Sequence, residues 1–242
     1  MNTGILLQAR CNSKRFPEKV LKKINKKTML ETILLRLSNL KKIKLIVVTT
    51  KHKSDNKIVN ILKKNKVSYY RGKTKDVLSR FYNASIKYKI KTIIRCNADC
   101  PFIDFRLINK MLRKFKKKRY DYLSNILEPS YPSGMHIEIF NFDTLKKINK
   151  LAKDVSDREH VTPYIYNNPK KFNIYSYKQK IDMSKHRWTV DYPEDLLFTR
   201  EVYNKLNYNN NFNTSDVLRI LNNNPDLKKI NYFLKKKQNL LK

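Results

Sequence analysis

Residues 4–21, with the sequence GILLQARCNSKRFPEKVL, decide how the fold of this chain is interpreted. An apolar run of strand length at 5–7 is followed by a polar stretch, and Pro17 then interrupts regular structure. The polar stretch carries four cations, which are Arg10, Lys14, Arg15 and Lys19. Cations clustered at the end of a buried strand indicate a site for a strongly anionic ligand, with a solvated basic loop as the alternative.

The composition indicates a globular protein with a strongly basic surface. Hydrophobic residues make up 40% of the 242, and 54 Lys plus Arg against 20 Asp plus Glu give a formal charge of +34. The cations are dispersed along the chain and most are lysines, so we interpret the charge mainly as solvated surface. Specific nucleic-acid binding is therefore not expected, although a basic nucleic-acid-binding protein stays an alternative.

The sequence favours a cytoplasmic protein that does not insert into a membrane. No apolar run approaches the ~18 residues that cross a bilayer, and the N-terminus lacks the apolar core of a signal peptide. The three cysteines, Cys11, Cys96 and Cys100, are predicted to be reduced, because their number is odd and their spacing fits no disulfide framework. A zinc site that combines these cysteines with a histidine is the weaker alternative, since C-x-x-x-C matches zinc spacings poorly.

The order of strand and helix patterns predicts an α/β fold. Strand patterns at 5–7, 43–50, 67–70 and 92–97 alternate with helical patterns at 29–41, 54–64, 76–84 and 104–115. This alternation indicates βαβ units, and so a three-layer, Rossmann-like fold with a mostly parallel central sheet. In the first helix Arg36 is placed on the polar side, opposite the apolar positions.

The second half of the chain is less regular, and no linker or repeat separates it from the first half. Strands are predicted at 121–125, 136–140, 172–177 and 187–191, and helices at 142–152, 158–167, 193–206, 214–222 and 227–236. We therefore predict a single domain over residues 1–242.

Two segments are expected to meet at one edge of the sheet, because parallel sheets bind ligands at the carboxyl ends of their strands. The basic stretch from Arg10 follows the first predicted strand, and the segment 97–101, NADCP, follows the fourth. Asp99 and Asp191 each follow a strand pattern and could share a Mg²⁺ ion if their carboxylates lie within about 7 Å. The alternatives are a helix cap or turn residue for Asp99 and the N-cap of the helix at Pro193 for Asp191.

Phosphate is expected to be held by side-chain cations rather than by a glycine-rich loop. The chain has three glycines, Gly4, Gly72 and Gly134, and contains neither G-x-x-x-x-G-K-[ST] nor G-x-G-x-x-G. Arginine can bind phosphate oxygens bidentately, and lysine acts as a point charge.

Six motifs together resemble the cytidylyltransferase family, which activates acidic sugars such as acylneuraminates and 3-deoxy-octulosonate as CMP-sugars. They are QARxxSxRxPxKVL at 8–21, RGxxxDVLxR at 71–80, NxDCP at 97–101, YPxG at 131–134 with Glu138, REHVTPY at 158–164 and RWTVDYPEDL at 187–196. The pattern is most similar to the spore-coat-polysaccharide branch, and the motifs extend over nearly the whole chain.

The resemblance implies a glycosyltransferase-A-like nucleotidyltransferase fold, with a nucleotide-binding half at 1–120 and a sugar-binding half with C-terminal helices at 121–242. It implies a Mg²⁺-dependent enzyme whose partners are CTP or another nucleoside triphosphate, a sugar or sugar acid, and a second copy of the chain. Such an enzyme would transfer CMP to a nonulosonate or similar sugar, with release of pyrophosphate, for surface-polysaccharide synthesis. A glycosyltransferase on the same fold is an alternative, but its donor needs no triphosphate clamp and there is no D-x-D at Asp99.

The family pattern also implies roles for individual residues. The nucleotide would be bound by Gln8, Ala9, Arg10, Ser13, Arg15, Lys19, Arg71, Asp76, Arg80 and Asn97, with Arg15, Lys19 and Asp99 catalytic. The sugar would face Tyr131, Glu138, His160 and Arg187, and the metal would be held by Asp99 and Asp191. Glu18 and Ala98 depart from the pattern, which usually has glycine at both positions. We expect Glu18 to be unfavourable beside a triphosphate, and strained if its φ is positive.

Overall fold

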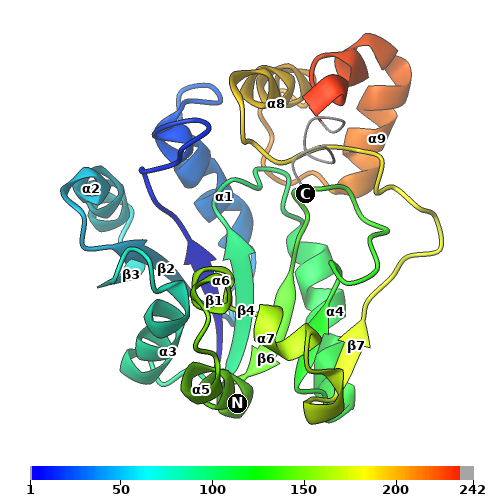
Figure 1. Ribbon diagram of the computed structural model, residues 1–242. Helices are drawn as coiled ribbons and strands as arrows, with labels where there is room; N and C mark the ends of the chain where they lie inside the picture. The colour runs from blue at the N-terminus through cyan, green and yellow to red at the C-terminus, as the bar shows by residue number, and fades with distance from the viewer. Residues whose placement is uncertain (1, 235–242) are drawn as a thin grey trace.

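The computed structural model describes residues 2–234 and contains a seven-stranded sheet in the order β3-β2-β1-β4-β6-β5-β7 (Figure 1). The strands are β1 (Thr3–Gln8), β2 (Lys44–Thr50), β3 (Ser68–Gly72), β4 (Thr92–Asn97), β5 (Tyr122–Ser124), β6 (Glu138–Asn141) and β7 (Ile174–Ser176). Strand β6 runs antiparallel to β4 and β5, and the other neighbouring pairs are parallel. The predicted mostly parallel α/β sheet is confirmed.

Helices cover both faces of the sheet. One face carries α1 (Met29–Leu37), α2 (Asn56–Lys64), α4 (Phe105–Lys117), α8 (Pro193–Lys205) and α9 (Thr214–Asn223). The other carries α3 (Val77–Lys87), α5 (Phe142–Leu151), α6 (Val155–His160) and α7 (Pro163–Tyr166). Because side chains alternate along a strand, Ile5 and Leu7 of β1 enter the first core and Leu6 enters the second. The result is the predicted three-layer arrangement.

Short 3₁₀ helices complete the secondary structure: η1 (Lys19–Leu21), η2 (Lys53–Asp55), η3 (Pro169–Lys171) and η4 (Pro225–Lys229). The predicted helix at 227–236 is wrong over 227–229, where the chain forms η4 with Pro225 in its first turn, and is confirmed at 232–234, which are helical. The Leu227 N–H donates to the carbonyl of Asn224, which is the tight spacing of a 3₁₀ turn. Residues 235 and 236 of that prediction lie outside the described residues.

The predicted helix at 158–167 is confirmed at 158–160 and 163–166 but is not continuous, because two short helices meet there at a sharp corner. Helix α6 ends at His160, and α7 begins at Pro163, which has no N–H to continue the first helix. Between them Val161 has a φ of 75°, and the Thr162 N–H donates to the carbonyl of His160. The corner turns the end of α6 toward the carboxyl end of the sheet.

The predicted strand at 187–191 is wrong as well. Arg187 makes a single isolated bridge with Ser133, and residues 188–191 belong to no strand. Two N–H groups of the segment are bound by loop carbonyls, since Trp188 donates to Ser133 and Val190 donates to Asp99. The β-branched pattern therefore does not show that the segment pairs with loops instead of the sheet.

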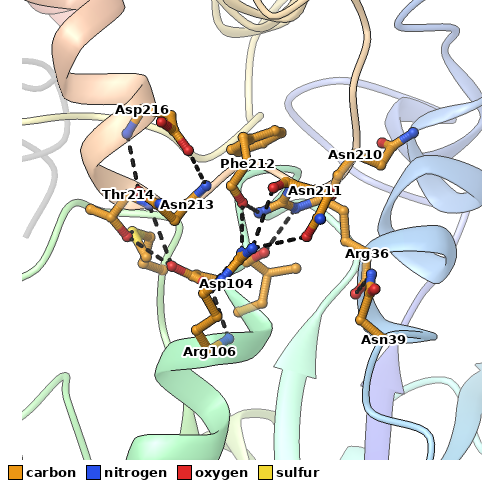
Figure 2. Close-up of polar contacts among 12 residues, drawn as sticks. Arg36, Asn39, Asp104, Arg106, Asn210, Asn211, Phe212, Asn213, Thr214 and Asp216 are labelled. Atoms are coloured by element: carbon orange, nitrogen blue, oxygen red, sulfur yellow. Dashed lines mark hydrogen bonds and ion pairs between the residues drawn. The ribbon is translucent and has the colours of Figure 1, made fainter.

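Arg36 is buried, contrary to the prediction that it lies on the polar side of α1. Its guanidinium donates to the carbonyls of Ile103, Asn210 and Phe212 (Figure 2). The same group lies 3.5 Å from the centre of the Phe212 ring. These acceptors come from segments far away in the sequence, so helical periodicity cannot reveal them.

Among the described residues, each helix is too short or too polar to cross a membrane.

Candidate active site

A cavity of about 290 Å³ opens at the carboxyl ends of β1 and β4. These strands end level with each other, because Gln8 lies opposite Asn97 in the parallel pair. Ten residues predicted from the sequence line the cavity: Gln8, Ala9, Arg10, Ser13, Arg15, Lys19, Asn97, Asp99, His160 and Asp191. The basic loop and the two candidate metal ligands therefore share one site.

The loop after β1 is fixed by a buried carboxylate that the sequence did not single out for this role. Asp55 accepts hydrogen bonds from the backbone N–H groups of Cys11 (2.8 Å) and Thr50 (3.1 Å), and from the hydroxyls of Thr49 and Thr50. Burial alone would raise the pKa of Asp55, but these hydrogen bonds hold it below its ordinary value of 3.8. Asp55 is the N-cap residue of α2, yet its side chain makes no capping bond.

Lys19 joins the two candidate metal ligands at the centre of the site. Its Nζ lies 2.6 Å from Asp99 Oδ2 and 2.8 Å from Asp191 Oδ1. Two oxygens this close to one nitrogen are less than about 6 Å apart, within the span that one ion can bridge. Burial alone would lower the pKa of Lys19, but Asp99 and Asp191 raise it above its ordinary value of 10.5.

A second cation, Arg15, also reaches Asp191. Its guanidinium lies 2.8 Å from Asp191 Oδ1, and nearly half of the Arg15 side chain is exposed to the cavity and solvent. Burial alone would raise the pKa of Asp191, but Lys19, Arg15 and Arg187 hold it below its ordinary value of 3.8. Asp191 therefore carries a full negative charge at neutral pH.

Backbone contacts carry Asp191 to the side of Asp99. The Val190 N–H donates to the carbonyl of Asp99 at 2.9 Å, and the Thr189 hydroxyl donates to the same carbonyl. The turn at Gly134 packs directly against the backbone of Trp188 and Thr189. These contacts place the Asp191 carboxylate, which belongs to the second half of the chain, near the end of β4.

Neither candidate metal ligand serves as a helix cap: Asp99 lies in the turn that follows β4, as its alternative predicted, and the N-cap of α8 is Tyr192 and not Asp191. Asp104 caps α4 through the Arg106 N–H. At α8, Asp195 accepts from the N–H groups of Asp191 and Tyr192, which leaves the Asp191 carboxylate to the cavity.

Three predicted nucleotide-binding residues lie outside the cavity wall formed by the described residues. Arg71 donates to the carbonyls of Thr50 and His52 and so holds the turn after β2. Asp76 caps α3 and forms an ion pair of 2.8 Å with Arg158. Arg80 is fully buried and donates to the carbonyl of Thr74, and burial lowers its pKa to about 10.

Three predicted sugar-facing residues also stand outside that wall. Tyr131 stacks on Tyr177 with ring centres 6.3 Å apart. Glu138 is 4% exposed and accepts from Arg95, from the Tyr122 hydroxyl and from the Thr162 hydroxyl. Arg187 forms a buried bidentate pair with Asp195 at 2.8 and 2.7 Å.

Sequence reasoning missed two charged residues of the cavity, Arg95 and Glu159. Arg95 precedes Asn97 by two positions in β4, so strand alternation places both on one face and could have identified it. Glu159 lies 3.7 Å from Arg10 at the end of α6, and the motif REHVTPY at 158–164, which contains it, could have identified it.

The two departures from the family pattern have different outcomes. Glu18 has a φ of 55°, as expected for a position where glycine is usual, but its carboxylate pairs with Lys57 at 2.7 Å. It is therefore directed away from the cavity and does not line it. Ala98 lines the cavity and is not among the positive-φ positions of residues 2–234, so alanine fits its backbone.

The donor set at the cavity suits a hard divalent ion. Asp99 and Asp191 supply carboxylate oxygens at one point, and Mg²⁺ typically takes one or two carboxylates and completes its shell with water and phosphate oxygens. Within residues 2–234, no group of three or more His, Cys, Asp or Glu side chains is placed to hold a metal. The zinc alternative therefore lacks a ligand set, and the three cysteines are free and buried.

Comparison with known proteins gives a family match over nearly the whole chain. A sequence model of the family described as "Cytidylyltransferase" matches residues 4–236. The solved structure of a cytidylyltransferase from Leptospira borgpetersenii serovar Hardjo-bovis has a TM-score of 0.90 at 33% identity, over 94% of this chain and 97% of that one.

Two relatives are similar in sequence along their whole length. An uncharacterised protein of Methanocaldococcus jannaschii is 37% identical over 237 residues, which cover 96% of this chain and 95% of the relative. The spore coat polysaccharide biosynthesis protein SpsF of Bacillus subtilis is 28% identical over 229 residues, covering 91% and 94%.

Proposed function

This chain belongs to the cytidylyltransferase family, and we propose that it transfers CMP from CTP to an acidic sugar, a nonulosonate or a similar compound. The family and the nucleotidyltransferase activity predicted from the motifs are confirmed by the match over residues 4–236. The name of the relative SpsF supports a role in surface-polysaccharide or glycan synthesis. One observation carries the proposal: cations of the loop after β1 face two carboxylates across a single cavity.

The triphosphate would be bound by Arg10, Arg15 and Lys19. Arginine forks fit phosphate oxygens, and the buried Asp55 fixes the backbone from which these side chains extend. Arg10 is paired only loosely with Glu159, at 3.7 Å with both side chains well exposed, so a phosphate can replace that partner at little cost.

The reaction would be an in-line displacement at the α-phosphorus. A sugar hydroxyl oxygen donates a lone pair to form the new P–O bond, and the bond to the oxygen that bridges the α- and β-phosphates breaks. That oxygen keeps the bonding pair and leaves with pyrophosphate, while the hydroxyl proton passes to a base. His160 lines the cavity and supplies an imidazole for this transfer.

Charge stabilisation would come from the cavity's own cations and a bound ion. Asp99 and Asp191 are the residues that would hold Mg²⁺, which neutralises phosphate charge when bound. Arg15, half exposed at the cavity edge, is placed to interact with the charge that develops on the leaving pyrophosphate.

The test is release of pyrophosphate from purified protein given Mg²⁺, one nucleoside triphosphate and one sugar. The panel pairs CTP, and each other nucleoside triphosphate, with 2-keto-3-deoxy sugar acids and sugar phosphates. We expect release with CTP and an acidic sugar, and a loss of about 100-fold or more in Asp99→Asn. Asp226→Asn, which alters an exposed carboxylate paired with Lys229, is the matched control and should keep full activity.

If no combination releases pyrophosphate above the Asp99→Asn background, the proposal is wrong. Release with a sugar phosphate instead of a sugar acid would correct the acceptor.

A further inference from the structure

The carboxylates that would hold the metal are already occupied by a cation of the chain itself. Lys19 Nζ lies between Asp99 and Asp191, at 2.6 and 2.8 Å, and Lys19 is 8% exposed. Arg15 lies 2.8 Å from the same Asp191 oxygen that Lys19 contacts. The site is thus electrically balanced before any ligand arrives.

This balance has a physical reason. Two carboxylates held this close repel each other, and burial of an unpaired charge is strongly unfavourable. The backbone hydrogen bond from Val190 to Asp99 holds the two segments together, which limits how far the carboxylates can move apart. A resident ammonium removes the repulsion and keeps both side chains aimed at one point.

The same geometry prevents Lys19 and a divalent ion from using these oxygens together. Mg²⁺ binds carboxylate oxygens at about 2.1 Å, so an ion that bridges them would lie against the ammonium group. The repulsion between a dication and a cation at such a distance, in a partly buried site, is large. One must leave when the other binds.

The Lys19 side chain is able to change its position within the cavity. It begins η1 directly after the loop, its four-carbon stem is flexible, and the cavity that it lines also contains Arg10, Ser13 and Arg15. A triphosphate placed among those residues offers the ammonium a second anionic partner.

We propose that Lys19 is the internal counter-ion of the metal site, an inference that rests on the proposed function. When metal and nucleotide bind, the Lys19 ammonium group leaves Asp99 and Asp191 and pairs with a phosphate of the nucleotide instead. The nucleotide-free enzyme then binds divalent ions weakly, because each ion must displace Lys19. A bound nucleotide removes this competition, because its phosphates pair with the Lys19 ammonium group. Nucleotide and metal therefore strengthen each other's binding.

The test measures Mn²⁺ binding to nucleotide-free protein by electron paramagnetic resonance of the free ion. Lys19→Met keeps the length of the side chain and removes its charge, and we expect it to bind Mn²⁺ at least about tenfold more tightly than wild type. Lys57→Met is the matched control, because Lys57 also pairs with a carboxylate but outside the cavity, and it should bind Mn²⁺ as wild type does. Equal or weaker Mn²⁺ binding by Lys19→Met overturns the inference.

A measurement on wild-type protein avoids any dependence on the folding of the variant. Acetylation of Lys19 by an amine-reactive reagent, followed by peptide mass spectrometry, should rise severalfold when saturating Mn²⁺ is added without nucleotide. Acetylation of Lys57 should not change. If Mn²⁺ leaves the acetylation of Lys19 unchanged, Lys19 stays between the carboxylates and the exchange does not occur.

Calorimetry with CTP and Mg²⁺ separates this inference from the proposed function. If CTP does not bind wild type, the proposed substrate is wrong, whatever the Mn²⁺ result. If CTP binds but Mn²⁺ affinity is the same in wild type and Lys19→Met, only the counter-ion role fails.

Discussion

At the scale of single residues, the adjacent side chains of Glu18 and Lys19 point to opposite sides of the loop and have different roles. Glu18 has a φ of 55° and its N–H donates to the carbonyl of Cys11, which closes the loop. That turn sends the Glu18 carboxylate to Lys57 on the outside and the Lys19 ammonium to Asp99 and Asp191 on the inside. The unusual carboxylate is thereby kept away from the phosphates.

The backbone cost of Glu18 can be measured with two variants. Glu18→Gly and Glu18→Ala both remove the pair with Lys57, but only glycine adopts a positive φ without strain. We expect Glu18→Gly to have a free energy of unfolding higher than that of Glu18→Ala by about 1 kcal/mol. Urea unfolding monitored by circular dichroism checks this, and equal stability of the two variants would show that the loop carries no strain.

At the scale of elements, the turn at Gly134 and the segment at 187–191 form one structural unit. Ser133 donates to His186 and accepts from Trp188, and Gly134 has a φ of 100°. A Cβ atom at Gly134 would lie 2.4 Å from the Thr189 nitrogen and 2.5 Å from the Trp188 carbonyl carbon. The unit therefore positions Asp191, although neither segment belongs to the central sheet.

Gly134→Ala tests this dependence. We expect it to lower the free energy of unfolding by about 2 kcal/mol or more, because alanine clashes with fixed backbone and is strained at this φ. Gly4→Ala is the control, since its Cβ would meet only the side chain of the buried Ile90, at 2.8 to 3.2 Å, and not backbone atoms. The Mn²⁺ and CTP affinities of Gly134→Ala should also fall, as Asp191 shifts. A variant as stable as Gly4→Ala would contradict the predicted role of the turn.

The elements of the first half could be predicted because strand and helix patterns there reflect burial in one sheet. The strand at 92–97 has the predicted bounds, and Asp76 and Asp104 cap the helices they were expected to open. In the second half, the segment 187–191 has the composition of a strand but is bound by loops, and such partners are invisible to periodicity.

At the scale of the whole molecule, the strand order explains where the cavity lies. From β1 the chain runs through β2 to β3 on one side and then crosses to β4 on the other side. The gap between the loops that leave β1 and β4 is the switch point at which parallel sheets bind ligands. This is why the basic loop and Asp99 could be placed together from the sequence.

Several residues predicted to contact ligand lie outside the cavity wall formed by the described residues, and for a common reason. Motif positions such as Arg71, Glu138 and Arg187 carry charge, which suggests contact with ligand, but each is satisfied by protein groups. A sequence does not reveal whether a charged residue meets substrate or holds the wall behind it. The predicted homodimer likewise stays a prediction.

Arg36 links the C-terminal helices to the sheet, and so it bears on the stability of the whole fold. Its guanidinium joins α1 to the segment before α4 and to the loop before α9, where Asp104 and Thr214 make a further contact (Figure 2). Arg36→Met would fill similar space but leave the carbonyls of Ile103 and Asn210 without this donor, while the Phe212 carbonyl would keep only Arg106. We expect a loss of about 3 kcal/mol in the free energy of unfolding, because most of these acceptors are buried.

Arg106→Met is the matched control for Arg36→Met. Arg106 donates to the same loop, at Asn211 and Phe212, but more than a third of its side chain is exposed. Water can replace it, so its loss should cost less than about 1 kcal/mol. Urea titration of both variants compares their stabilities. A shift in the unfolding midpoint without a change in the slope of the free energy against urea concentration reports stability alone. Equal midpoints would mean that the loop is held by its apolar contacts, chiefly the Phe212 ring packed among Phe102 and Tyr203, and not by the buried guanidinium.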